Sequence, residues 1–175
     1  MKKFKLTSEF IVDISGVKLF RIKALIEFGN VKAGDLGGYI EKEENLSHMG
    51  DAWVSDDARI SGNAQVFGNA QVFGDAQVSG NARVSGNARV SGDAQVFGDA
   101  RVSGDKDYAY AHGFGSCNRT TTFFRLKDGD VGVRCGCFYG TLAQFRDKVC
   151  ETHGETKKAQ EYLMLADLME IRFKN

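Results

Sequence analysis

Residues 50–103 read GDAWVS DDARIS GNAQVF GNAQVF GDAQVS GNARVS GNARVS GDAQVF GDARVS, nine consecutive hexads without an insertion. A fixed period of this kind defines the architecture before local propensity is considered. Within a hexad, Ala and Val alternate with polar or variable positions, which predicts a short strand with Ala and Val on its inner face. The Gly-Asn or Gly-Asp pair predicts a turn, because these residues tolerate a positive φ angle.

Six residues therefore form one side and one corner, and three hexads close a triangular coil. Two weaker hexads, 38–43 and 44–49, precede the block, so we expect just under four coils. At about 4.8 Å per coil the stack is roughly 15–20 Å tall. Hexads three apart share a face of the triangle, and each face carries a large aromatic residue. We expect these residues to contact partner copies in a homotrimer, or to be covered by the terminal segments: Trp53, Phe67, Phe73 and Phe97.

The repeat resembles the left-handed parallel β-helix of hexapeptide-repeat proteins, in which an aliphatic residue and, four positions later, a small residue recur every six. Val66 with Ala70 and Val72 with Ala76 fit this pattern. Enzymes that resemble the repeat are usually trimeric acyltransferases with a histidine between subunits as general base. None of the three histidines lies in the nine clean hexads, and His112, just after them, is the candidate base. Acyl transfer is therefore one alternative function.

The flanking segments predict caps at both ends of the solenoid. Runs at 10–13 and 17–22 are strand-like and surround a Ser-Gly turn. The fold class we expect is mainly β, a short left-handed parallel β-helix with an N-terminal β cap and a C-terminal ββαα element. Its domains are 1–37 for the cap, 38–105 for the β-helix and 106–175 for the ββαα domain.

The ββαα element follows from a hairpin signal and two helix signals. Asp128-Gly129 between strand-like runs 120–126 and 131–138 predicts a two-residue loop with Lys127 opposite Asp130. Thr141 with Gln144 forms a capping box for a helix that ends at Gly154. A second apolar stripe predicts a helix from about Thr156 to Phe173.

Composition and charge exclude some classes of protein. The chain has 175 residues, 23 Lys and Arg, and 23 Asp and Glu, so no global field gathers nucleic acid nonspecifically. Its apolar runs are far shorter than the roughly 20 residues of a membrane span. The start, MKKFK, precedes no apolar stretch, so we expect no signal peptide. Four cysteines without an export signal indicate reduced thiols in a cytoplasm.

The cysteines raise the possibility of a zinc site. Cys135-Gly136-Cys137 is a C-x-C pair, and no second paired knuckle follows it. The predicted hairpin places Cys135 and Cys137 on the apolar face, so we interpret them as small core residues. Whether Cys135, Cys137 and His153 bind zinc stays open. We expect no cofactor and assign no catalytic residue.

The same register predicts an anion-binding face on the other side of the hairpin. Arg side chains offer bidentate donors to phosphate, and Phe rings offer a stacking platform. The alternative is that the rings are covered by a helix or by the solenoid while the arginines pair with acids. The residues predicted to bind a partner protein or a small phosphate-bearing ligand are Arg119, Arg125, Arg134, Phe123, Phe138 and Thr121, with Ser116 and Asn118 from the preceding loop.

The whole arrangement looks like a family of phage and prophage proteins. The resemblance rests on FRIKALIEFGNVKAGDLGGYIE (20–41), on the hexads, and on GSCNRTTTFFRLKDGDVGVRCGCFYGTLAQFRDKVCETHG (115–154). The resemblance implies a mobile-element origin, and with it the cytoplasm of a bacterial host, but no established chemistry. Because no complete catalytic constellation is visible, our hypothesis is a non-enzymatic binding protein that engages and inhibits a host component. Anti-CRISPR inhibition or sequestration of a nucleotide signal are its concrete forms, and a structural phage protein is a further alternative.

Overall fold

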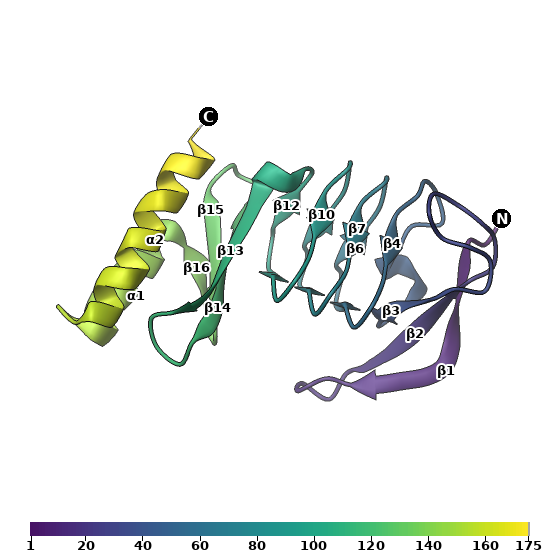
Figure 1. Cartoon of the computed structure of the whole chain (residues 1–175), viewed down its shortest axis with the longest axis horizontal. Coiled ribbons are helices and arrows are strands. Elements are labelled where there is room, and N and C mark those ends of the chain that lie inside the picture. Colours follow the sequence, from purple (N-terminus) through teal and green to yellow (C-terminus); the bar gives the residue numbers. More distant parts are fainter. Residues whose placement is uncertain (175) are drawn as a thin grey trace.

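A stack of short parallel strands forms the centre of the molecule (Figure 1). The structure is a computed structural model that describes residues 1–174. Each strand pairs with the one 18 residues later, as Trp53 does with Gln71 and Arg59 with Gln77. This register confirms the triangular coil of three hexads and the parallel β-solenoid. The strands are β4 (Trp53–Val54), β5 (Arg59–Ile60), β6 (Gln65–Val66), β7 (Gln71–Val72), β8 (Gln77–Val78), β9 (Arg83–Val84), β10 (Arg89–Val90), β11 (Gln95–Val96) and β12 (Arg101–Val102).

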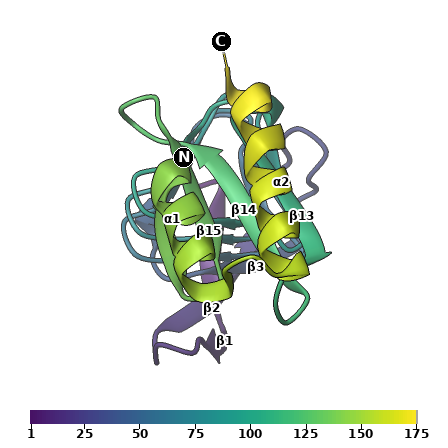
Figure 2. The ribbon, with the colours of Figure 1, turned by 90° about the vertical axis from the view of Figure 1, so that its left-hand side faces the viewer.

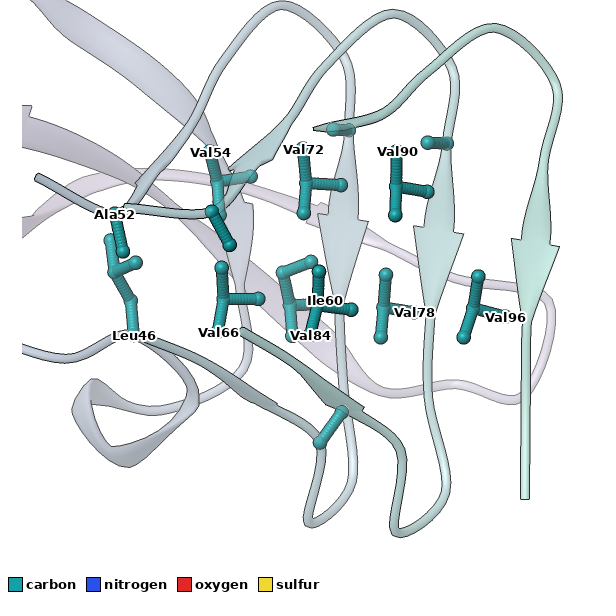
Figure 3. Close-up of a cluster of buried hydrophobic side chains, with 14 of the residues drawn as sticks. Leu46, Ala52, Val54, Ile60, Val66, Val72, Val78, Val84, Val90 and Val96 are labelled. Carbon is teal, nitrogen blue, oxygen red and sulfur yellow. The ribbon is translucent and has the colours of Figure 1, made fainter. Parts of the chain in front are cut away.

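The inward Ala and Val side chains of these strands form the core. Every hexad Ala from Ala52 to Ala100 is fully buried. Figure 3 shows the larger aliphatic residues stacked in columns along the solenoid, such as Val54, Val72 and Val90. Because burial of one such side chain contributes about 1.5–3 kcal/mol, the repeated column is the main source of stability.

The N-terminal segment extends one face of the solenoid. Strand β3 (Leu36–Ile40) pairs in parallel with β5 and antiparallel with β2 (Lys18–Ala24), which pairs with β1 (Phe4–Val12). The resulting sheet has the order β1-β2-β3-β5-β8-β11. The far half of the β1–β2 hairpin, residues 10–20, is called the hairpin arm below. It leaves the stack and runs beside the coils (Figure 1).

The first coil is capped by hydrogen-bond donors. Lys3 Nζ donates to the carbonyl oxygens of Gly50 and Ala52, at 3.2 and 2.7 Å. Buried Asn45, in a short 3-10 turn (η1, Glu43–Asn45), donates in the same way to two carbonyl oxygens of the next side, at 3.1 and 2.8 Å. These side chains replace the N–H groups that a preceding coil would supply. Burial lowers the pKa of Lys3 from 10.5 to about 8, although nearby Asp51 acts in the opposite direction.

The last coil is capped by hydrogen-bond acceptors. A carboxylate oxygen of Asp105, in the second 3-10 turn (η2, Asp105–Asp107), accepts from the N–H of Arg89 at 2.8 Å. Thr122 Oγ1 accepts from the N–H of Gln95 at 2.9 Å. The first coil therefore needs donors and the last coil needs acceptors, because the first exposes C=O groups and the last exposes N–H groups of the same parallel ladder.

A four-stranded antiparallel sheet and two helices complete the chain. The strands are β13 (Tyr108–Phe114), β14 (Arg119–Arg125), β15 (Val131–Cys135) and β16 (Phe138–Thr141), in that order. The sheet thus has four strands where two were predicted. Both helices are confirmed: α1 (Leu142–His153) and α2 (Lys157–Phe173) begin after the caps Thr141 and Thr156. They lie side by side over one face of the sheet (Figure 2). Neither of these helices, within residues 1–174, is long and apolar enough to cross a membrane.

The register of the β14–β15 hairpin differs from the prediction by one residue. Arg125 pairs with Val131, and the N–H of Leu126 donates to the carbonyl oxygen of Asp130 at 2.8 Å, so the loop 127–129 has three residues rather than two. Gly129 occupies the left-handed position that such loops require. A slip of one residue moves side chains to the opposite face. Phe123 therefore shares the helix side of the sheet with Val133, whereas Phe124 lies on the solenoid side.

Candidate functional site

The predicted anion-binding face does not exist, because its residues lie on different sides of the sheet. Arg134 lies on the solenoid side, 4.9 Å from the ring centre of Phe97. Arg125 lies on the helix side and donates to the carbonyl oxygen of Phe173 at 2.9 Å. Phe123 is 0% exposed in the helix-side core, and Thr121 is also buried. The prediction of one shared surface is wrong, because it depended on the two-residue loop.

Three of the predicted binding residues do come together elsewhere. Ser116, Arg119 and Phe138 line a cavity of about 180 Å³ beside the two helices, called the helix-side cavity below. Sequence reasoning missed the Tyr162 hydroxyl there, which accepts from the N–H of Ser116 at 3.0 Å. Asn118 is outside this set, in an exposed turn with a φ of 46°.

Two of the four solenoid aromatics are covered by this chain itself. Trp53 is 5% exposed and packs against Phe28, with ring centres 5.4 Å apart. Phe97 is covered by Arg134 and by Tyr139, whose ring centre lies 5.0 Å away. Contact of Trp53 with partner copies is therefore a wrong prediction, because the N-terminal segment covers it. Phe97 is half-buried under the C-terminal sheet, and its contact with partner copies stays a prediction.

The remaining two aromatics are half-buried on the solenoid faces. Arg83 stacks over Phe67 at 5.3 Å, and Arg89 over Phe73 at 5.5 Å. Each arginine comes from the next coil on the same face. A role of these two rings in a homo-oligomer stays a prediction.

The residues considered for metal binding and catalysis are dispersed. Among residues 1–174, no three His, Cys, Asp or Glu side chains are grouped as a metal site would need. Cys135 is half-buried and packs against the helix-side core, but Cys137 is exposed, so its assignment to the core is wrong. Strand β15 ends at Cys135, and Cys137 lies in the turn after it. His112 is exposed and lies 2.9 Å from Thr120 Oγ1 and 3.9 Å from Asp93. It lines neither the helix-side cavity nor the groove described next.

A groove of about 460 Å³ lies between the hairpin arm and the solenoid. All three parts of the chain contribute to it: Asp13 and Leu19 from the arm, the outer face of β5, β8 and β11, and Arg134 from β15. Its size falls within the range of about 300–1,000 Å³ that is common for ligand clefts. The arm brings residues close to the middle of the solenoid that local sequence patterns do not connect with it.

Three side chains form a column on the floor of this groove. Arg59, Gln77 and Gln95 are paired successively across β5, β8 and β11. All three side chains line the groove. Because hexads three apart share a face of the triangle, the repeat accounts for this column, but not for the arm that faces it.

The carboxylates of the groove are already engaged. Asp13 accepts from the N–H groups of Ser15 and Val17 at 2.8 and 2.9 Å, which holds the turn of the arm. Glu41 accepts from the N–H of Gly62 at 2.6 Å. One oxygen of each carboxylate is thus used within the protein, and the rest of the polar lining consists of the arginines, the amides and the serine hydroxyls.

The repeat matches a known family model. Residues 58–80, 76–92 and 94–105 are similar to the YdcK beta solenoid repeat. The match covers the solenoid and neither terminal unit, and it describes a fold rather than a reaction. No curated protein matches the chain.

Proposed function

We propose that the protein is a non-enzymatic binding protein and that the groove holds an extended segment of a partner protein. The observation that carries this proposal is the column of Arg59, Gln77 and Gln95, three polar side chains that follow one another across β5, β8 and β11 along the groove. Carboxamide and guanidinium groups match the carbonyl and N–H groups of an extended backbone. The lining contains no histidine, cysteine or lysine, which favours binding over acyl transfer.

The hairpin arm carries a second, apolar surface next to the groove, because Phe10 and Val12 lie on the face of the arm opposite Leu19, which lines the groove. Phe10, Val12 and Ile14 are 45%, 56% and 106% exposed. They alternate along the arm and project beyond the packed body of the cap. Protein interfaces combine such apolar anchors with hydrogen-bonding groups and arginine, whereas a small ligand would leave the arm in water.

The biological form of this binding follows from the resemblance to phage and prophage proteins. On that basis the partner is a bacterial host protein, and binding inhibits it. Sequestration of a nucleotide has less support, because Arg119, Arg125 and Arg134 do not share a surface. We therefore favour a protein partner, including a component of host defence.

Site-specific photo-crosslinking tests the proposal. A benzophenone amino acid would replace Gln77 on the groove floor or Arg83 on the neighbouring face. Both are exposed and occupy the same position of their hexads, so Arg83 is the matched control. In the bacterial host we expect one crosslinked partner at position 77 and none at position 83. Equal crosslinking at both positions, or none at position 77, would overturn the groove assignment.

The charge of the column supplies a second test. Replacement Arg59→Glu removes a donor and introduces a carboxylate beside Glu41. We expect the dissociation constant of the captured partner to rise at least about tenfold, the effect of roughly 1.4 kcal/mol. The control Arg83→Glu should leave that constant unchanged.

A further inference from the structure

The helix-side cavity combines apolar walls with a polar floor. Phe138 and Phe145 form one wall, with ring centres 5.6 Å apart, and Val149 extends it along α1. On the floor, the thiol of Cys135 accepts from Thr121 Oγ1 at 3.2 Å and lies 3.8 Å from the Tyr162 hydroxyl. This space belongs to the C-terminal unit alone and is separate from the groove.

The rim of the cavity carries two cations. Arg119 is exposed and makes no ion pair within residues 1–174, whereas Lys148 pairs with Glu151 at 2.9 Å. The guanidinium of Arg119 folds back over Gly136, where a Cβ atom would collide with it. Gly136 also has a φ of 59°, so glycine at this position both makes the tight turn and leaves room for the arginine.

The Tyr162 hydroxyl contributes no negative charge that would oppose these cations. Burial is the largest cause that raises the pKa of Tyr162 above its ordinary value, and hydrogen bonds from Ser116 oppose this effect in part. The hydroxyl is therefore neutral at physiological pH, and its hydrogen bonds with Ser116 hold it at the floor of the cavity.

The size of the cavity limits its occupant. About 180 Å³ is below the range of about 300–1,000 Å³ for typical ligand pockets, so a whole nucleotide is not enclosed. One aromatic ring or a short branched chain fills such a space. An anionic group on that body would reach Arg119, whose planar donors suit a carboxylate.

We propose that the helix-side cavity is a binding site for a small carboxylic acid with an aromatic or branched aliphatic body. The body packs against Phe138, Phe145 and Val149, and the carboxylate binds Arg119 at the rim. The site is independent of the groove, so it neither requires nor excludes a protein partner there.

Protection of Cys135 from alkylation tests this site. In the full chain, Cys117, Cys137 and Cys150 would be replaced by serine, which leaves Cys135 as the sole thiol. Intact mass would follow alkylation by neutral iodoacetamide with millimolar benzoate, with benzyl alcohol, or without either. We expect benzoate to slow the reaction in a saturable way and benzyl alcohol to have little effect. Equal protection by both compounds would overturn the carboxylate assignment.

Arginine variants and a second readout complete the test. Replacement Arg119→Gln should weaken benzoate protection about tenfold, the loss of one charge-assisted hydrogen bond. Arg134→Gln is the matched control, because Arg134 lies on the opposite face of the same sheet. Amide resonances of Ser116, Arg119 and Val149 should shift when benzoate is added to the labelled full chain. No shift at these amides, whether or not Cys135 reacts, would refute the site.

Discussion

The buried lysine that caps the first coil makes stability depend on pH in a specific way. Lys3 is 1% exposed, and its pKa falls from 10.5 to about 8 because burial disfavours the charged ammonium. Below pH 8 it is protonated in both the folded and the unfolded chain. Between pH 8 and 10.5 the unfolded chain binds the extra proton, so the free energy of unfolding rises with pH in this window. The pKa difference corresponds to about 3 kcal/mol, at about 1.36 kcal/mol per unit.

Replacement Lys3→Met removes this ionisation. We expect the free energy of unfolding of the wild type to increase relative to Lys3→Met by up to about 3 kcal/mol from pH 7.5 to pH 10.5. Urea unfolding at a series of pH values measures the difference, with the fluorescence of Trp53 as the probe. Trp53 is the single tryptophan and packs on Phe28, over which Lys3 Nζ lies at 4.6 Å.

The control is Lys5→Met, the same substitution at an exposed position two residues away. Its profile should run parallel to that of the wild type. Burial of Tyr162 lowers stability above its ordinary pKa of 10, because the folded chain keeps a proton that the unfolded chain loses, but this effect is common to all three proteins. Parallel profiles of Lys3→Met and the wild type would refute the reasoning that Lys3 is capped in a buried, desolvated state.

Three further substitutions test the solenoid and its caps, and a fourth, Gly104→Ala, is the control for Gly80→Ala. Asn45→Asp puts a carboxylate against two carbonyl oxygens of the first coil. We expect the free energy of unfolding, measured with urea at pH 7, to fall by about 3 kcal/mol or more. A stability equal to that of the wild type would contradict the donor cap. Gly80→Ala should cost about 1–2 kcal/mol, because φ is 73° and the new Cβ lies 2.8 Å from a backbone nitrogen of the next coil. Gly104→Ala, which meets open space, should melt within a few degrees of wild type. Thr122→Val removes the acceptor for the N–H of Gln95 and should lower the free energy of unfolding by about 1–2 kcal/mol. Hydrogen exchange at the Gln95 amide should become faster. Unchanged exchange would show that the cap does not protect this amide.

Short-range sequence patterns and the strict hexad period were sufficient to predict the solenoid and the two helices. One corner per hexad leaves a single way to close a coil, so the pairing of residues 18 apart follows from the repeat. The caps Thr141 and Thr156 begin the helices where the sequence places them. Each of these features depends on neighbours within a few residues or on strict periodicity.

The hairpin register could not be decided in this way. Loops of two and three residues both suit the Asp-Gly signal, and a difference of one residue exchanges the two faces. The sequence did contain a signal for burial on both sides, because residues 120–124 include no charged side chain. All five residues are buried, since the helices cover one side of β14 and the solenoid covers the other. A strand buried on both sides gives no alternation from which to choose a face.

The position of the hairpin arm depends on contacts far apart in the chain. A register irregularity between Leu6 and Phe10 accompanies the departure of the arm from the sheet. The column of Arg59, Gln77 and Gln95 was predictable from the hexads, but the groove above it was not, because nothing local places residues 10–20 against that face. The sequence therefore predicts the floor of the groove but not the arm that forms its opposite wall.

The number of hexads also sets the angle between the N-terminal and C-terminal units about the axis of the solenoid. Each hexad advances the chain by one third of a turn, and each full coil advances it by one strand spacing, about 4.8 Å. The hairpin arm and Arg134 meet over the same face because Arg59 and Gln95 are separated by two whole coils. An insertion of 18 residues would lengthen the groove by one rung and preserve its two ends. An insertion of six would rotate the C-terminal sheet to a different face and separate Arg134 from the arm, so changes in the length of this solenoid are compatible with the groove only in steps of three hexads.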